Sequence, residues 1–383
     1  MGRWKPAAWA ISKRYIINKA GCKMRKARLV SFTFILLTLV SYSLSAADQL
    51  AKVQLLPNPV TFNWYTLPNT PVACNYCAGS MFTYDKIGQI CGKTTSGSVY
   101  PYIQFYQGGS WQVGTVPHPG GGVWGHSASQ LYAWTFTDVI VSGGATDSGY
   151  YNYTTDYKPS LNTWTQNTPM PQPNMIYTAM QWDLSGNLYL IGGQLGQGGM
   201  VLSTLYRWKP GDAAMTQLAS MPAPRCAAAV EWGPNGIFVF GGSADGINAT
   251  DTIFFYYVNG GTWTTMSAHL GTPRMGASAA FAGNMLYIFG GKNGGQYLSS
   301  VECYDYYSGM FIAGPTMPYP SAFHACSHYE MSNPKNRGYW TDIYLTGGSN
   351  QTGVLNNACR AYIVESDSKV TPTSLGNIKA LFH

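Results

Sequence analysis

Charged residues and histidines are scarce in this sequence, and their scarcity argues against several kinds of site. Asp, Glu, Lys and Arg together make up 10% of the 383 residues. The histidines within the chain are scattered, at His118, His126, His269, His324 and His328. His324 and His328 are four residues apart, but on a predicted strand that spacing does not form the ligand pair of a helix face. We therefore expect no metal ion and no other cofactor.

Motifs for phosphate binding and nucleophilic catalysis are also missing. The glycine-rich sites described below lack the lysine and the helix that a phosphate loop needs, and no nucleophile elbow is present. From residue 60 on, no long stretch has a helical period, and apolar runs alternate with turn residues. The pattern predicts an all-β chain, and it leaves open whether the protein is an enzyme.

The formal net charge of +7 comes from the N-terminal region. Nine of the 23 Lys and Arg residues, and none of the 16 Asp and Glu residues, lie in residues 1–47. The remaining chain has 14 basic and 16 acidic residues, which gives a net charge of about −2. Because no basic stripe follows, we expect no nucleic-acid partner.

Residues 1–47 are typical of a signal-peptide region. Met24–Arg28 is basic, Leu29–Val40 is apolar, and Ser45–Ala47 is a small-residue cleavage site. Met24 is an alternative start. The apolar run is short for a membrane span, so we expect export to the periplasm or the medium, without a stable membrane anchor.

Seven cysteines remain after the leader, which removes Cys22. They are Cys74, Cys77, Cys91, Cys226, Cys303, Cys326 and Cys359. Export permits disulfides, but the odd number leaves at least one free thiol in the monomer that we expect, and the pairing does not follow from the spacing. The C-x-x-C spacing of Cys74 and Cys77 is that of a redox-active motif, but no helical pattern follows it. The alternatives are a structural disulfide or free thiols in the core.

A pair of glycines that ends a short apolar run recurs along the chain. The second glycines are Gly144, Gly193, Gly242, Gly291 and Gly348, at intervals of 49, 49, 49 and 57 residues. A weaker copy, Cys91-Gly92, lies 52 residues before Gly144. Each pair is followed by a Tyr, then another aromatic residue such as Trp164, Trp208 or Trp263, and then by a proline-rich turn. We expect the Tyr and Trp side chains to pack between repeats, with their polar tips bonded to backbone.

These repeats resemble the kelch family over roughly residues 60–365. The resemblance implies a six-bladed β-propeller in which each blade has four antiparallel strands. The innermost strand follows the proline-rich turn, the second ends at the glycine pair, the third carries the Tyr, and the Trp strand is outermost. The implied propeller covers residues 48–365, and residues 366–383 form a C-terminal tail.

The sixth blade lacks an outermost strand after Cys359–Val364. Residues 62–71 parallel residues 161–169 of the second repeat. We therefore expect the N-terminal strand to complete the sixth blade and close the ring, which removes the exposed edges of an open array.

Strand alternation places the loops after the glycine pairs and the proline-rich turns on one face, here called the glycine-pair face. We predict a ligand site there, near the axis, that favours an anionic or polyhydroxyl compound. Arginines suit the capture of a carboxylate, although both arginines below occupy one repeat position and have a purely structural interpretation. The candidate ligand-binding residues are Arg225, Arg274, Lys292, Tyr177, His324 and Asp245.

A repeat of this kind is specific for the fold and nearly silent about function. We interpret the protein as an exported binding module for a carbohydrate, including an acidic sugar, or for a protein. The alternative is an enzyme, because the chain resembles the exported N-acetylneuraminate epimerases (mutarotases) in fold and size. That resemblance implies a catalytic glutamate and arginine in the central pocket. Arg225 and Arg274 could supply the arginine, and Glu231, Glu302, Glu330 and Glu365 are the few glutamates available.

Overall fold

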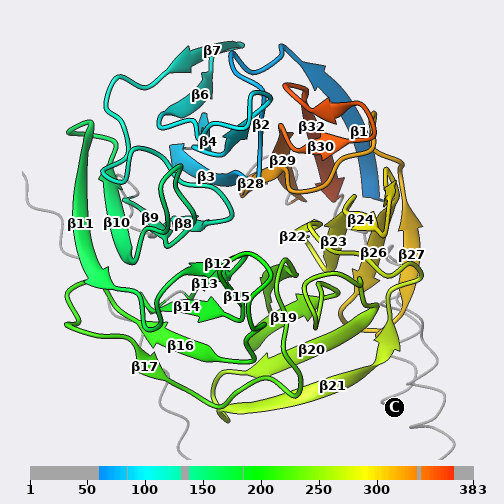
Figure 1. Ribbon diagram of the computed structural model, residues 1–383. Helices are drawn as coiled ribbons and strands as arrows, with labels where there is room; N and C mark the ends of the chain where they lie inside the picture. Colours follow the sequence, from blue (N-terminus) through cyan, green and yellow to red (C-terminus); the bar gives the residue numbers. More distant parts are fainter. Residues whose placement is uncertain (1–59, 84, 131–137, 184, 334–337, 366–383) are drawn as a thin grey trace, which may run out of the picture. The chain divides into compact units, whose positions relative to one another are not determined.

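The computed structural model describes residues 60–365, apart from 84, 131–137, 184 and 334–337. The predicted leader and tail lie outside these residues. The described chain forms six four-stranded antiparallel sheets arranged as a ring of blades (Figure 1). No helix occurs in the part of the chain that is described. The predicted six-bladed propeller is confirmed.

The chain runs outward from the axis in each of the first five blades, and consecutive strands pair. The strands, from the innermost outward, are as follows: blade 1, β3 Ala78–Thr83, β4 Lys86–Ile90, β6 Ile103–Gln107, β7 Ser110–Val113; blade 2, β8 Ser127–Gln130, β9 Val139–Ser142, β10 Tyr153–Lys158, β11 Thr163–Pro169; blade 3, β13 Ala179–Trp182, β14 Leu188–Ile191, β16 Leu205–Trp208, β17 Thr216–Gln217; blade 4, β18 Ala229–Gly233, β19 Gly236–Phe240, β20 Thr252–Tyr257, β21 Thr262–His269; blade 5, β22 Ser278–Ala282, β23 Met285–Phe289, β26 Val301–Asp305, β27 Phe311–Gly314.

Blade 6 joins the two ends of the propeller. It consists of β28 Ala325–Asn333, β29 Gly338–Thr346, β32 Ala358–Glu365 and, outermost, β1 Val60–Leu67. All eight residues of β1 pair antiparallel with β32, from Val60 opposite Glu365 to Leu67 opposite Ala358. The predicted closure of the ring by the N-terminal strand is therefore confirmed.

The glycine pairs link each blade to the next. The second glycine donates its N–H to a carbonyl in the turn that enters the following blade, as Gly193 does to Arg225 (2.8 Å) and Gly242 to Arg274 (2.8 Å). Gly242 has a φ of 83°, and a Cβ there would lie 2.8 Å from the carbonyl oxygen of Cys226. Only glycine fits this combination of left-handed backbone and close approach without strain.

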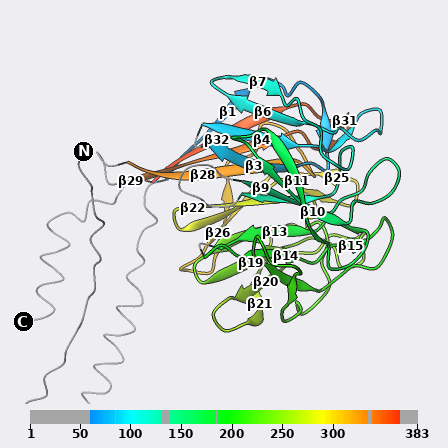
Figure 2. The same cartoon turned by 90° about the vertical axis from the view of Figure 1, so that its left-hand side faces the viewer.

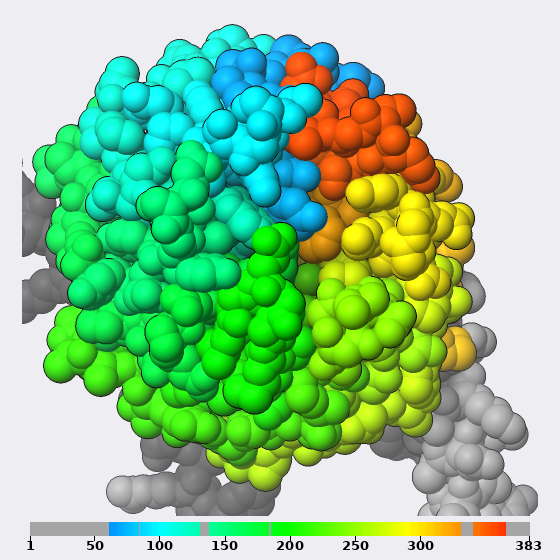
Figure 3. Space-filling view, in the orientation of Figure 1, coloured from blue at the N-terminus to red at the C-terminus, as the bar shows by residue number. Residues whose placement is uncertain are grey.

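Four two-stranded sheets lie beside these pairs on the glycine-pair face, which is the face seen in Figures 1 and 3. They are formed by β2 Cys74–Asn75 with β5 Lys93–Thr94, β12 Met175–Ile176 with β15 Gln194–Leu195, β24 Lys292–Asn293 with β25 Gln296–Tyr297, and β30 Ser349–Asn350 with β31 Gly353–Val354. The loops of all six blades surround the axis on this face (Figure 3).

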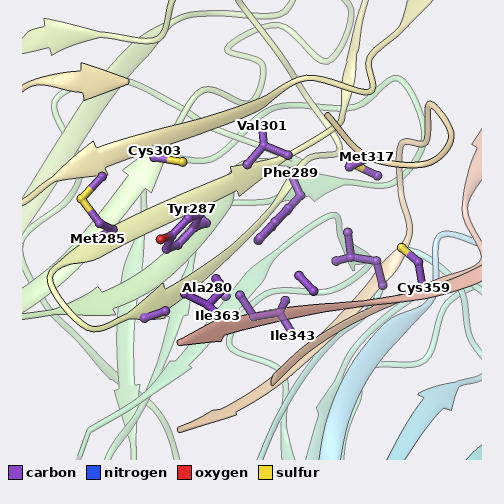
Figure 4. Packing of buried hydrophobic residues seen from close by; sticks show 13 residues of the cluster. Ala280, Met285, Tyr287, Phe289, Val301, Cys303, Met317, Ile343, Cys359 and Ile363 are labelled. Carbon is purple, nitrogen blue, oxygen red and sulfur yellow. The ribbon is translucent and has the colours of Figure 1, made fainter. Parts of the chain in front are cut away.

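The hydrophobic core lies between neighbouring blades. Figure 4 shows the cluster between blades 5 and 6, where Tyr287 and Phe289 of β23 pack with Ile343 and Ile363 of β29 and β32. Several outer-strand tryptophans contact this kind of core and bond to the backbone of the adjacent blade. The Nε1 of Trp111 donates to the carbonyl of Pro68 (2.7 Å), and that of Trp263 to Ala219 (2.8 Å). These bonds confirm the predicted role for Trp111 and Trp263. In blade 2, by contrast, Trp164 Nε1 has no hydrogen-bond partner among the described residues, and the Tyr157 hydroxyl donates to the side chain of Asn162 (2.8 Å).

Two features depart from the regular repeat. Trp208, which the pattern placed on an outermost strand, lies with Tyr206 on β16, the third strand of its blade; the outermost strand there, β17, has no Trp. In blade 6, β28 and β29 have nine residues each, and their hairpin extends past the other blades on the face opposite the glycine pairs (Figure 2). We call that side the hairpin face.

No helix in the described ranges has the length and apolar character that crossing a bilayer requires.

Candidate functional site

A ring of six equivalent residues surrounds the axis at the glycine-pair face. Each stands just before an innermost strand and has a left-handed backbone, with φ between 50° and 64°. Each donates its N–H to the carbonyl of its counterpart in the preceding blade, over distances of 2.6 to 3.0 Å, and the circle closes between blades 6 and 1. The ring residues are Tyr76, Gly125, Tyr177, Ala227, Gly276 and Phe323. This circle holds the inner strands at fixed spacing around the axis.

Three aromatic rings from this circle meet one another over the axis. The ring centroids of Tyr76 and Phe323 are 4.5 Å apart, those of Tyr76 and Tyr177 are 5.6 Å apart, and those of Tyr177 and Phe323 are 6.0 Å apart. We call these three residues the aromatic plug. Lys292 lies with its Nζ 5.7 Å from the Phe323 ring centroid.

Beneath the plug, the innermost strands of all six blades enclose an axial cavity of about 370 Å³. Its walls are small and polar near the plug and larger toward the hairpin face. Among the lining residues are Ser80, Met81, Ser127, Gln130, Gln181, Trp182, Glu231, Trp232, Ser278, His324, Cys326 and His328. Neither Lys nor Arg is among the residues that line this cavity in the described ranges.

Glu231 is the one acidic residue among these lining residues. It lies on β18 and is only 4% exposed. Burial raises the pKa of its carboxyl to about 8, although the backbone N–H of Trp232 (2.9 Å) and the amide of Gln181 oppose this shift. The group is therefore mainly protonated at neutral pH and can donate a hydrogen bond.

His328, on β28 of blade 6, faces Glu231. The distance between His328 Nε2 and Glu231 Oε2 is 3.8 Å, and the imidazole side chain is 30% exposed. Desolvation lowers the pKa of His328 to about 4. Because burial favours the uncharged form of each group and 3.8 Å exceeds a hydrogen bond, we treat the two as a neutral acid and a neutral base with a gap between them.

His324 lies deeper in the cavity. Its Nε2 is 2.8 Å from the hydroxyl of Ser278, which comes from the neighbouring blade. An analogous pair, Ser127 with Thr178, has its hydroxyls 3.0 Å apart. Burial lowers the pKa of His324 to about 4. Cys326, a cavity residue between the two histidines, is also uncharged, because burial raises the pKa of its thiol to about 12.

The two predicted arginines do not line this cavity. Arg274 is fully buried within blade 5, where it forms an ion pair with Glu302 and donates to the carbonyl of Gly290 (2.9 Å). Arg225, 5% exposed, donates to the carbonyl of Pro224 (2.7 Å) and lies 4.5 Å from the ring centroid of Phe254. Both side chains thus have partners inside blades, as the structural interpretation of their shared repeat position predicts.

The other predicted residues are divided between the axis and the loops. His324 lines the axial cavity, and Tyr177 belongs to the plug. Asp245 bonds within its own loop, to the backbone N–H groups of Ile247 and Asn248 (both 2.8 Å), and these bonds hold its pKa well below the usual range. The structure therefore brings only His324, Tyr177 and, next to the plug, Lys292 near the axis.

Sequence reasoning missed the polar layer at the far end of the inner strands. Gln130, Trp182, Trp232 and His328 occupy the same position in four blades, five residues after the ring residue of their own blade. Aligning the inner strands on the turns that precede them would have brought these residues together. The described residues contain no cluster of three or more His, Cys, Asp or Glu side chains arranged to hold a metal ion.

Comparison with known proteins agrees with this architecture. A family model described as the KLHDC2/KLHL20/DRC7 Kelch-repeats domain matches residues 176–368, which is half of the chain. The chain belongs to the Kelch-repeat family. Membership of this family supports a role as a binding module in general.

One similar solved structure is that of YjhT. It matches with a TM-score of 0.62 and 15% sequence identity, over 79% of this chain and 98% of that one. At this identity the likeness concerns the fold. No curated protein sequence matches the chain.

Proposed function

We propose that this Kelch propeller binds a neutral polyhydroxyl compound of monosaccharide size in its axial cavity. The observation that carries the proposal is the lining: uncharged donors and acceptors from six strands stand together with two tryptophans around one enclosed space. A water molecule occupies ~30 Å³ in the liquid, so the cavity volume of 370 Å³ equals that of about twelve waters. A cavity of this volume suits one hexose.

The electrostatics of the cavity favour a neutral ligand over an acidic one. Glu231 is protonated and His328 is uncharged at neutral pH, so each offers hydrogen bonds without a net charge. A ligand carboxylate would find no lysine or arginine among the lining residues. Burying an unpaired carboxylate costs several kcal/mol, so we favour a neutral sugar over the acidic sugar that the arginines suggested.

Calorimetric titration of the propeller with neutral hexoses and with two acidic sugars, glucuronate and N-acetylneuraminate, tests the proposal. A neutral hexose should bind, and Gln181→Ala should weaken its binding by about tenfold through one lost hydrogen bond. Glu330→Gln is the matched control, because Glu330 lies on β28 but does not line the cavity. Preferential binding of the acidic sugars, or binding that Gln181→Ala leaves unchanged, would overturn the assignment.

A second candidate function, catalysis of sugar anomerisation, is favoured by the position of Glu231 opposite His328. For a reducing sugar whose ring oxygen and anomeric hydroxyl face both groups from the cavity, the Glu231 carboxyl would give its proton to the ring oxygen while His328 Nε2 takes the proton of the anomeric hydroxyl. The bond between the anomeric carbon and the ring oxygen breaks, the carbonyl turns, and reclosure returns both protons.

Polarimetry of freshly dissolved α-D-glucose or α-D-galactose measures this activity directly. Both Glu231→Gln and His328→Asn should abolish the protein-dependent rate while the melting temperature is kept. If the two variants bind sugar and the wild-type protein still adds nothing to the spontaneous rate, the protein is a binding module only.

We also propose export of the mature chain as a monomer. The support is the order of basic, apolar and small residues in Met24–Ala47, together with a mature net charge near zero. N-terminal sequencing of the mature protein should begin near Asp48, and intact residues 24–47 on a membrane-bound form would contradict export.

A further inference from the structure

The aromatic plug is built at positions where a side chain is unfavourable. Tyr76, Tyr177 and Phe323 have φ values of 52°, 53° and 55°, in the left-handed region. For bulky residues this conformation is a rare exception, and such strain persists where the surrounding structure uses it. Glycine fills the same position in blades 2 and 5, so nothing in the repeat itself demands an aromatic residue.

The three rings reach across the axis. Tyr177 comes from blade 3 and Phe323 from blade 6, which face each other across a six-membered ring of blades. Their centroids are nevertheless 6.0 Å apart, and Tyr76 from blade 1 contacts both. Rings from opposite blades can touch only if they close the space between the inner strands.

The remaining positions of the circle are small, and their size fits the rings. A Cβ at Gly276 would lie 2.8 Å from the Phe323 ring, and one at Gly125 would lie 3.2 Å from the Tyr177 ring. Large and small residues are therefore matched around the circle, as they are in a packed core.

We propose that Tyr76, Tyr177 and Phe323 act as a fixed stopper that closes the axial channel at the glycine-pair face, so that ligands enter and leave by the hairpin face only. A cavity of about 120 Å³ lies directly against the plug residues and shares His324, Ala228 and Ala277 with the main cavity. Without the rings the two spaces would join and open at both faces. The stopper thereby sets the depth of the ligand site. This statement about depth rests on the proposed function, whereas the closure of the channel does not.

The test is the triple variant Tyr76→Gly, Tyr177→Gly and Phe323→Gly, in the full propeller. Glycine adopts the left-handed backbone conformation without strain, so these substitutions remove the aromatic rings and leave the backbone conformation favourable. Ala227→Gly is the matched control, since Ala227 belongs to the same circle at a φ of 50° and carries no ring. The single variant Tyr177→Gly serves if the triple variant does not fold.

The readout is alkylation of Cys326 by iodoacetamide at about pH 8.5, followed by mass spectrometry of the labelled peptides. Cys326 lines the main cavity and is the only half-buried cysteine in the described ranges, while Cys303, buried inside blade 5, reports unfolding. We expect the Cys326 rate to rise about twofold in the triple variant, because the glycine-pair face then adds a second entrance to the one at the hairpin face. The rate should stay at the wild-type value in Ala227→Gly, with Cys303 unlabelled in both.

Equal Cys326 rates in the triple variant and in Ala227→Gly, with Cys303 still protected, would overturn the stopper. This assay needs no sugar, so a failure here is distinct from a failure of sugar binding. If a hexose binds, the triple variant should lose selectivity for a monosaccharide over the matching disaccharide. Faster alkylation with unchanged selectivity would support closure of the channel by the plug but refute its role in setting the depth of the site.

Discussion

The two ends of the propeller axis are built from the same repeat and differ in almost every physical property. At the glycine-pair face the six blades share a closed circle of backbone hydrogen bonds, and aromatic rings fill its centre. At the hairpin face the inner strands carry Gln, Trp, Glu and His side chains around a cavity. One end holds the ring together, and the other is free to vary its chemistry without cost to the fold.

The difference between the two ends follows from where the backbone forms hydrogen bonds between blades. The N–H and carbonyl groups at the glycine-pair face bond from blade to blade, so a changed side chain there disturbs two blades at once. In the described ranges, the backbone of the inner strands toward the hairpin face pairs within its own hairpin, as Ala229–Gly233 does with Gly236–Phe240. The side chain of Gln181 also donates across blades, to the carbonyl of Val230 (3.0 Å). Mutations should therefore separate into costly ones at the first end and functional ones at the second.

The largest effect is expected when the closure of the ring by β1 is removed and the circle of backbone hydrogen bonds at the glycine-pair face is left to hold the ring. Deleting residues 48–67 removes β1, which pairs with β32 along its whole length. Blade 6 then exposes an edge, and we expect loss of cooperative unfolding in urea. A truncated chain that melts like the full one would mean that the glycine-pair end closes the ring by itself.

The next largest effect is expected at Arg274, which supports the turn that precedes Gly276. Arg274→Ala leaves Glu302 buried without its ion-pair partner and should lower the free energy of unfolding by about 3–5 kcal/mol. Arg207→Ala is the control, because Arg207 is exposed on the third strand of blade 3. Denaturant titrations compare the two. If Arg274→Ala lowers the free energy of unfolding no more than Arg207→Ala does, the Arg274 guanidinium has no structural role and is again a candidate ligand-binding group.

A smaller effect is expected from a pair of glycine substitutions that samples both ends. Gly242→Val places a Cβ 2.8 Å from the Cys226 carbonyl oxygen, and we expect a loss of roughly 1–3 kcal/mol. Gly211, in a turn at the hairpin face, also has a positive φ, of 101°, but nothing lies within 4 Å of a Cβ there. Gly211→Val introduces backbone strain without a close contact, so its loss of unfolding free energy in the same denaturation series should be smaller. Equal losses would show that backbone conformation, and not the close contact with the turn that enters the same blade, limits the glycine pairs.

The contrast between the ends also explains what could be predicted from the sequence. The spacing of the glycine pairs predicted the repeat, and the resemblance to the kelch family implied the strand order of each blade. The likeness of residues 62–71 to residues 161–169 predicted the closure. All three rest on local patterns that repeat along the chain. The one strand misplaced, that of Trp208, lies in the blade whose outermost strand, Thr216–Gln217, lacks the Trp landmark.

The cavity was harder to predict because its residues share no pattern. Glu231 and His328 are 97 positions apart and belong to blades 4 and 6, and only the curvature of the ring brings them within 3.8 Å. Arg225 and Arg274 attracted attention because they repeat, and repetition marks a structural role more often than a site. The plug was missed for the opposite reason: Tyr76, Tyr177 and Phe323 share their repeat position with the small residues of the other three blades, so no consensus appears there.

The smallest effect expected is a pH dependence that comes from the hairpin end alone. The folded-state pKa of Glu231 is raised to about 8 from its ordinary value of 4.5, so the folded protein keeps a proton that the unfolded chain releases between these values. The contribution of Glu231 to stability is therefore complete below pH 4.5 and is lost as the pH rises through about 8. His328 has the opposite sign, because its pKa falls from 6.5 to about 4, and its contribution to stability declines as the pH falls over that interval.

Glu231→Gln should therefore flatten the decline of the free energy of unfolding between pH 4.5 and about 8, by an amount on the order of 1 kcal/mol. Below pH 4.5, where Glu231 is protonated in the folded and the unfolded chain alike, the curves of the wild type and the variant should stay parallel. Melting curves of the wild type and the variant from acid to alkaline pH measure both ranges. Parallel curves above neutral pH would place an ionised Glu231 in the cavity, and the cavity would then favour a cationic ligand over a neutral sugar.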